Sequence, residues 1–326
     1  MNDRQRFLEV MRFGKPDRLL LFGEGMRSQV LRTWRKQGLR DNQELSQFFH
    51  YDAYEEFCPN LEAGIDLLRL DPSGAGLSAL QRSLDPGDPS RLPRDWKKQV
   101  DQWSQREHVL ILQVHDGFFL TLGVGDWRSF NQAIYLTADH PDFVRQVFAI
   151  QAEFAAQLTE RILNEVEVEA VLFSEPIAGN HGPLISPRMY AELVLASLTP
   201  LMETIARHGV QVIIYRTYAN PQPLLKEVFQ AGFNCLWACE RQSQALDYIE
   251  LRGQLGPHLR LIGGIDLDVL RQGPDAIQKE LERVVPPLVE QGGYLPLADG
   301  RVREDITFHD YAFYRRCLEQ IAHPAS

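Results

Sequence analysis

Residues 209–221 read Gly-Val-Gln-Val-Ile-Ile-Tyr-Arg-Thr-Tyr-Ala-Asn-Pro, and this stretch decides the fold class. Its first half, residues 210–215, is a short apolar run rich in β-branched side chains, which is typical of a strand buried on both faces. The second half turns polar and ends at a proline, which a central strand does not tolerate. A helix is expected over residues 223–230. A buried strand that brings polar side chains to its carboxyl end, before a helix, is how α/β barrels build active sites.

The same strand-then-helix pattern continues through most of the chain. Further strands are predicted at residues 18–22, 109–114, 168–173, 234–238, 259–262 and 294–297. Further helices are predicted at residues 3–13, 28–37, 44–49, 141–164, 186–208, 246–254, 274–291 and 308–322. Alternation of this kind indicates parallel strands. With one more strand from the irregular region, the count is about eight and predicts a (β/α)8 TIM barrel.

An open, doubly wound sheet is the alternative architecture, but no strand is followed by a glycine-rich nucleotide-binding motif, which disfavours it. Residues 51–107 lack clear periodicity, and Pro, Gly and Asp gather at 71–76 and 85–93. This region is interpreted as loops and short strands that cap one end of the barrel. We therefore expect one domain over residues 1–326, with an N-terminal elaboration of helices and loops.

The composition and charge of the chain limit the partners and the cellular location that can be expected for it. The net charge of −10 and the pI near 5.4 argue against nucleic acid or an anionic membrane surface as the main partner. No apolar run is long enough to span a bilayer, and the N-terminus lacks the apolar core of a signal peptide. The four cysteines are too few and too scattered for a disulfide framework. A cytoplasmic protein is the expectation.

Several motifs resemble the uroporphyrinogen decarboxylase-like superfamily. They are Gly-Pro-Leu-Ile-Ser-Pro at 182–187 followed by Met189 and Tyr190, Leu-Ile-Gly-Gly-Ile-Asp at 261–266, Gly-Gly-Tyr at 292–294 with Asp305 downstream, and the N-terminal segments 6–11 and 15–18. The similarity is good from residue 168 to the C-terminus and thin between 51 and 109. The resemblance implies a TIM barrel whose active site lies at the carboxyl ends of the strands.

The superfamily contains cofactor-independent decarboxylases of tetrapyrroles, and corrinoid-linked methyltransferases with a zinc site made of a His-x-Cys pair and a later Cys. In this chain the matching positions are Arg216, Tyr218 and Gly300. None of these side chains is a plausible zinc ligand. The arginine-rich motif by which the decarboxylases hold substrate carboxylates is replaced by residues 23–27, Gly-Glu-Gly-Met-Arg. We therefore expect no bound metal and no tightly bound cofactor.

From the resemblance, three functions are open. The first is methyl transfer from a small methylated substrate with a corrinoid (cobalamin) protein as partner, without the family zinc. The second is decarboxylation, or a related lyase reaction, of a carboxylated substrate that Arg216 holds. The third is a non-catalytic small-molecule-binding barrel. The first is preferred because the motifs at 182–187 and 261–266 are closer to the methyltransferase branch. A homodimer is also compatible with the sequence.

The candidate site residues follow predicted strands. The catalytic candidates are Glu175, Arg216, Tyr218 and Asp299. The candidates for substrate binding are Glu24, His115, His181, Asn220, Asp266 and Arg301. Glu175 suits a general acid or base if it is desolvated, and Arg216 suits a carboxylate or phosphate. Structural alternatives are an ion pair of Arg216 with Glu175 or Asp299, and capping of the next turn by Asp266.

Overall fold

The computed structural model describes residues 1–39, 45–241 and 246–322. The chain forms two compact units. Unit 1 comprises Met1–Glu55, Glu107–Val109 and Cys235–Ser326, and unit 2 comprises Glu56–Arg106 and Leu110–Asn234. Both are α/β structures with parallel strands, as the alternating pattern predicted.

In unit 2, three strands form a parallel ladder that is apolar over most of its length. They are β2 (Val109–His115), β3 (Ala170–Glu175) and β6 (Ile213–Tyr218). Leu112 pairs with Val171, which in turn pairs with Ile213. A two-residue hairpin, β4 (Ala178–Gly179) with β5 (Gly182–Pro183), follows β3, and β1 (Tyr54–Phe57) lies at the beginning of the unit.

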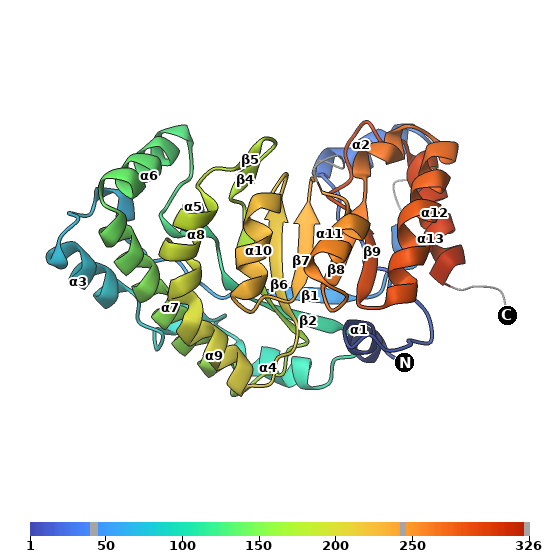
Figure 1. The fold of residues 1–326 in the computed structure, drawn as a ribbon. Helices are drawn as coiled ribbons and strands as arrows, with labels where there is room; N and C mark the ends of the chain where they lie inside the picture. The colour runs from blue at the N-terminus through green and yellow to red at the C-terminus, as the bar shows by residue number, and fades with distance from the viewer. Residues whose placement is uncertain (40–44, 242–245, 323–326) are drawn as a thin grey trace. The chain divides into compact units, whose positions relative to one another are not determined.

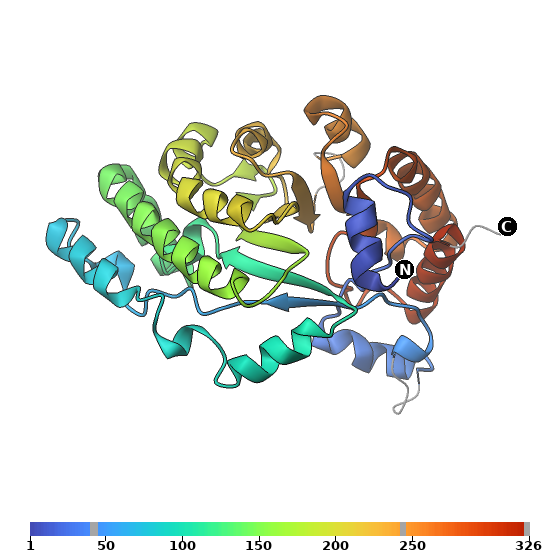
Figure 2. The same ribbon diagram turned by 90° about the horizontal axis from the view of Figure 1, so that it is seen from below.

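The helices of unit 2 include several with a proline in the first turn. The helices of this unit are α3 (Gly74–Ser83), α4 (Trp96–Ser104), α5 (Phe118–Thr121), α6 (Trp127–Asp139), α7 (Pro141–Leu163), α8 (Pro187–Leu193), α9 (Thr199–Arg207) and α10 (Gln222–Gln230). The long helix α7 starts at a proline and buries one stripe of apolar residues. It lies against α9, as Figures 1 and 2 show from two sides.

Two expectations for unit 2 were wrong. The region 51–107 contains the helices α3 and α4, besides loops, two 3₁₀ turns at Leu67–Arg69 and Pro89–Arg91, and one short strand. The single helix expected over 186–208 is broken into α8, a 3₁₀ turn at Leu195–Leu198, and α9. α8 ends at Leu193, and a proline in the first turn of α9 has no N–H to bond back to the 3₁₀ turn before it. Ser186 caps the start of α8, since its Oγ accepts from the Met189 N–H at 3.2 Å.

Unit 1 holds a second parallel ladder. Its strands are β7 (Cys235–Cys239), β8 (Arg260–Ile265) and β9 (Tyr294–Ala298). Its helices are α1 (Asp3–Met11), α2 (Ser28–Lys36), α11 (Tyr248–Leu255), α12 (Pro274–Gln291) and α13 (Phe308–Ala322), with 3₁₀ turns at Leu45–Gln47 and Leu267–Arg271. Helices α12 and α13 lie side by side (Figure 1). The predicted bounds of these last two helices are confirmed.

The strand expected at 18–22 does not form. Both backbone groups of Leu21 form hydrogen bonds with Asp52 instead of with a neighbouring strand. The Leu21 N–H donates to Asp52 Oδ2 at 2.6 Å, and the Leu21 carbonyl accepts from the Asp52 N–H at 2.9 Å. The side chains of this segment are still buried at Leu20, Leu21 and Phe22, which is why the apolar run read as a strand. The helix expected at 44–49 is a 3₁₀ turn where the chain is described, and its first residue lies outside the described residues. No described helix has the length and apolar character needed to cross a membrane.

Candidate functional site

The register of β3 and β6 separates two of the predicted catalytic residues. Ser174 lies opposite Arg216, and Glu175 lies opposite Thr217. Successive side chains of a strand point to opposite faces, so Glu175 and Arg216 project from opposite faces of the sheet. The ion pair between them that the sequence allowed is therefore not formed.

Arg216 is instead held by Glu56. Its Nη1 lies 2.7 Å from Glu56 Oε1 and 2.8 Å from Oε2, and its Nη2 donates to Gln113 Oε1 at 3.4 Å. The side chains of Arg216 and Glu56 are 15% and 23% exposed. The guanidinium thus has a carboxylate partner from the protein, and a substrate carboxylate would have to displace or share it.

Gln113 extends this contact into a larger polar group. Its Nε2 donates to Asp116 Oδ1 at 2.6 Å, and its Oε1 also accepts from the Cys58 thiol at 3.5 Å. Burial raises the pKa of Asp116, although the Gln113 donor partly opposes this. The Arg216 cluster is defined as Glu56, Cys58, Gln113, Asp116 and Arg216. It contains one guanidinium and two carboxyl groups.

On the other face of the sheet, Glu175 lies fully buried at the end of β3. It accepts hydrogen bonds from the Phe118 N–H and the Tyr190 hydroxyl, both at 2.9 Å. Its Oε2 is 3.8 Å from His115 Nε2, which is too long for a hydrogen bond. Burial and the adjacent carboxylate raise the pKa of Tyr190 well above its usual range, so Tyr190 stays a donor.

Gly117 makes the contact with Glu175 possible. Its φ of +89° lies in the left-handed region, and a Cβ there would stand 2.5 Å from the Ser174 carbonyl oxygen and 2.8 Å from Glu175 Oε1. Only a glycine can bring the backbone this close, and the next residue, Phe118, then donates its N–H to the carboxylate.

A cavity of about 490 Å³ opens beside His115 in unit 2. It is lined by Leu61, Glu62, Ala63, Gly64, Ile65, Leu67, Val114, His115, Asp116, Leu120, Thr121, Gly123, Val124, Gln151 and Ala155. We call it the His115 cavity. Its volume is within the usual range for small-molecule sites, and a mostly apolar wall with a few polar groups is also typical of them.

The other candidates of unit 2 are dispersed. Tyr218 has the same parity on β6 as Arg216, so it projects to the same face, and it is half-buried. Asn220 Oδ1 accepts from the Gln222 N–H at 3.3 Å, at the start of α10. His181 is exposed in the turn of the β4–β5 hairpin. Of these three residues, only Tyr218 shares a face with the Arg216 cluster.

In unit 1, Asp299 lies at the end of β9 and is 2% exposed. Its Oδ1 accepts from the Leu267 N–H at 3.0 Å, and its Oδ2 lies 3.1 Å from Arg241 Nε. Burial raises the pKa of Asp299 to about 7, and Arg241 only partly opposes this. An acid that titrates near neutral pH is suited to proton transfer.

Asp266 has a structural role, and Arg301 lies at the surface. Asp266 Oδ1 accepts from the Asp268 N–H at 2.8 Å and caps the 3₁₀ turn after β8, which is the structural alternative named for it above. Arg301 is exposed. The candidate site residues belong to both units, and a common active site formed by them stays a prediction.

Glu24 is buried in a group of side chains from α13. It accepts from the hydroxyls of Tyr311 at 2.7 Å and Tyr314 at 2.5 Å, and Arg315 Nη1 lies 3.5 Å away. All three partners are fully buried. A carboxylate enclosed by its own hydrogen-bond donors is a structural element, so the substrate-binding role expected for Glu24 has no support from its surroundings.

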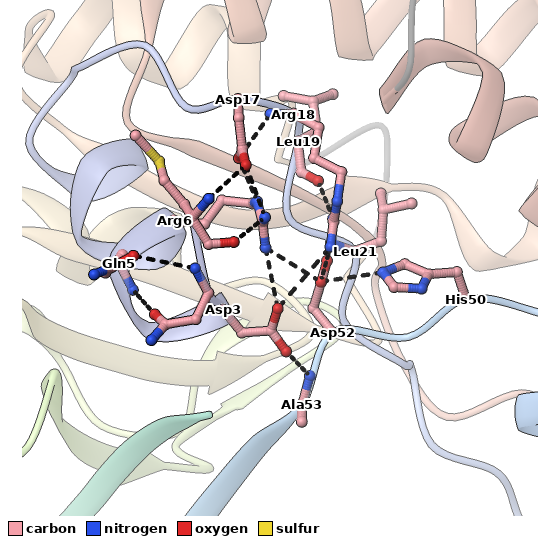
Figure 3. A network of polar contacts seen from close by, with 12 residues as sticks. Asp3, Gln5, Arg6, Asp17, Arg18, Leu19, Leu21, His50, Asp52 and Ala53 are labelled. Carbon is pink, nitrogen blue, oxygen red and sulfur yellow. Dashed lines mark hydrogen bonds and ion pairs between the residues drawn. The ribbon is translucent and has the colours of Figure 1, made fainter. Parts of the chain in front are cut away.

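The N-terminal residues that carried part of the family resemblance form a structural network (Figure 3). Arg6 Nε donates to Asp17 Oδ1 at 2.7 Å, and Arg18 donates from Nη1 to Asp52 Oδ2 at 2.7 Å and from Nη2 to Asp52 Oδ1. Burial alone would raise the pKa of Asp52, but the donors from Arg18 and the Leu21 N–H lower it to about 2. These ion pairs fasten α1 to the segment before β1.

The residues at the family's zinc positions do not fit a zinc ion. Arg216 is in an ion pair, and a Cβ added at Gly300 would lie 3.1 Å from Glu240 Cγ and 3.4 Å from Leu267 Cδ2. A side chain at Gly300 would therefore need these two neighbours to shift by a few tenths of an ångström. Among the described residues, no group of three or more His, Cys, Asp or Glu side chains is placed to bind a metal.

Sequence reasoning missed several residues of these groups. Glu56, Cys58, Gln113 and Asp116 were not candidates, nor was Tyr190. Gln113 gave a usable signal, because a polar residue interrupts an otherwise apolar strand. Glu56 gave none, since it precedes Arg216 by 160 residues in an irregular region.

Comparison with known proteins agrees with the fold. The model of the uroporphyrinogen decarboxylase (URO-D) family matches residues 123–295, which is more than half of the chain. The chain therefore belongs to the URO-D family. Its structure is similar to that of a methyltransferase from Methanosarcina mazei, with a TM-score of 0.61 and 12% identity over 99% of this chain and 100% of that one.

A candidate vitamin-B12-independent methionine synthase from Listeria monocytogenes also matches, with a TM-score of 0.35 and 10% identity over 69% of this chain and 68% of that chain. A search of curated protein sequences finds no match. At 12% identity the Methanosarcina mazei structure supports the fold alone, and the reaction has to be argued from the site.

Proposed function

We propose that this URO-D-family protein is an enzyme that transfers a methyl group from a small methylated substrate to a corrinoid carried by a partner protein, without the zinc of related methyltransferases. The similarity in fold to a methyltransferase over the whole chain is compatible with this branch. The closed eight-stranded barrel and the cytoplasmic location expected from the sequence belong to the same proposal.

The charge of the Arg216 cluster is the observation that carries the proposal. Its one guanidinium is bound by Glu56, and its second carboxyl group is Asp116. A substrate with several carboxylates needs unpaired cations to hold it, and like charges facing each other cost several kcal/mol. The cluster thus favours a neutral or cationic substrate over a polycarboxylate.

The protein's own part in such a reaction is positioning and proton supply. When a methyl group leaves a heteroatom, the bond between them breaks and the heteroatom needs a proton. Asp116 borders the His115 cavity, and burial raises the pKa of this carboxyl, so it holds a proton at higher pH than an exposed aspartate does. His115 lines the same cavity, with the Glu175 carboxylate behind it.

Decarboxylation is the second candidate, because Arg216 remains 15% exposed and could receive a carboxylate if Glu56 moved away. A non-catalytic binding role is the third. Family membership is compatible with either one.

A spectroscopic assay distinguishes the candidates. The protein is incubated with cob(I)alamin and, separately, with methyl ethers, methyl thioethers and N-methylamines, and methylcobalamin is followed by absorbance. Parallel samples contain uroporphyrinogen. We expect protein-dependent methylcobalamin with one class of donor, a lower rate for Asp116→Asn, and an unchanged rate for Asp142→Asn, whose carboxylate is exposed on α7. Decarboxylation of the porphyrinogen without methyl transfer would replace the proposal by the second candidate, and no reaction in any sample would leave the binding role.

A further inference from the structure

The His115 cavity has a one-sided set of charges. Its lining includes the carboxyl groups of Glu62 and Asp116, and none of the lining residues is Lys or Arg. The remaining wall is aliphatic, apart from His115, Thr121 and Gln151. A site of this kind repels anions and attracts a cation whose body is apolar.

Some polar side chains on the wall of the His115 cavity have hydrogen-bonding groups that no described residue uses. Gln151 is 9% exposed and its side chain makes no hydrogen bond to another described residue, whereas His115 is 7% exposed, with Nε2 buried, without a hydrogen-bond partner and 3.8 Å from Glu175 Oε2. Asp116 uses Oδ1 for the Gln113 amide, whereas its Oδ2 accepts from no described group. Buried polar groups normally have partners, so the nearly buried Gln151 amide, with the half-buried Asp116 carboxyl on the same wall, calls for a ligand with hydrogen-bond donors.

The lining also determines which kind of cation fits. Quaternary ammonium ions, which have no N–H, are usually recognised by the faces of Phe, Tyr or Trp, and none of these residues lines the cavity. Carboxylate and amide oxygens are instead acceptors for N–H groups. A protonated amine supplies both the positive charge and the donors.

We propose that the His115 cavity binds a protonated amine with a small aliphatic body, and that Asp116 is the acceptor for its N–H. This inference rests on the proposed function in one respect: the methylated substrate would then be an N-methylamine rather than an ether or thioether. Its nitrogen already carries the proton that the leaving group needs, so Asp116 acts there as an ionised acceptor and not as the proton source. Binding to the cavity can be measured without any corrinoid, so it can fail or succeed independently of methyl transfer.

Calorimetry with three ligands of similar shape tests this. At pH 7.5 and low salt the probes are N-methyl-3-methylbutan-1-amine, which is protonated, methyl 3-methylbutyl ether, which is neutral, and 4-methylpentanoate, which is an anion. We expect the amine to bind at least about tenfold more tightly than the ether, which has neither the positive charge nor the N–H donors. The anion should bind most weakly, because the carboxylates of the cavity wall also repel it.

Two variants test whether Asp116 is responsible for the affinity for the amine. Asp116→Asn keeps the shape and the acceptor for Gln113 but removes the charge, so the amine should lose about tenfold or more in affinity while the ether is unchanged. Asp142→Asn removes one exposed charge from the same unit away from the cavity, and should change neither affinity. Equal affinities for amine and ether, an Asp116→Asn protein that binds the amine as before, or no binding of the amine would each overturn the proposal.

Discussion

The pair between Glu56 and Arg216 gives the sharpest energetic prediction. Its Nη1–Oε distances are 2.7 and 2.8 Å, and the two side chains are 15% and 23% exposed. At an effective dielectric constant of about 20, unit charges about 4 Å apart attract each other by about 4 kcal/mol. Desolvation of both groups removes part of this. We expect a coupling free energy of about 1–3 kcal/mol between the two side chains.

A double-mutant cycle with Glu56→Gln, Arg216→Met and the double variant measures this coupling from urea unfolding. The matched control is the pair Arg188–Glu192 on α8, which has the same N–O distance of 2.7 Å but side chains that are 85% and 50% exposed. The control is a local i,i+4 pair with both side chains largely exposed, so it should show the weaker coupling. If the Glu56–Arg216 coupling does not exceed that of the control, the guanidinium is not held by Glu56, and the charge argument against a polycarboxylate substrate fails.

Three further predictions concern buried groups. Tyr190→Phe removes a donor to the fully buried Glu175 and should lower the free energy of unfolding by about 1.5–3 kcal/mol, as measured by denaturant unfolding. Because the pKa of Asp299 is raised from 3.8 to about 7, the folded protein binds this proton more tightly than the unfolded chain does. The stability that this proton contributes is fully present below about pH 3.8 and is lost as the pH rises through about 7, a change of up to roughly 4 kcal/mol in the free energy of unfolding. The Asp299→Asn variant should lack this part of the pH dependence when its unfolding is compared at pH 5 and pH 8. Burial raises the pKa of the Cys235 thiol to about 12, so mass spectrometry after alkylation at pH 8 should find Cys58 modified and Cys235 intact unless the protein is first unfolded.

The sequence alone determined the class of fold and the larger helices. Apolar runs alternating with helical stripes indicated parallel strands, which both ladders confirm. Helix bounds were predictable where proline and glycine mark them, as at Pro274–Gln291, because these residues act on the backbone of their own segment. The family was also readable from the motifs, and the matching family model confirms it.

The ends of the strands were harder to predict from the sequence than the ends of the helices. The strand expected at 210–215 is Ile213–Tyr218, so it continues through the polar residues that were interpreted as its end. A strand takes in polar residues where one face of its sheet is only half-buried, as at Arg216 and Tyr218. Periodicity within one segment does not contain that information, because the burial of a face depends on what packs against it.

The partners of the candidate site residues were decided by tertiary structure. The sequence placed Glu175 and Arg216 at the ends of neighbouring strands, but the register set them on opposite faces of the sheet. Arg216 received its carboxylate from Glu56, which is 160 residues away in the chain. Local patterns report which residues are apolar and where the backbone bends. Charge pairs and hydrogen bonds between distant segments depend on the three-dimensional packing of those segments, so only the folded chain reveals them.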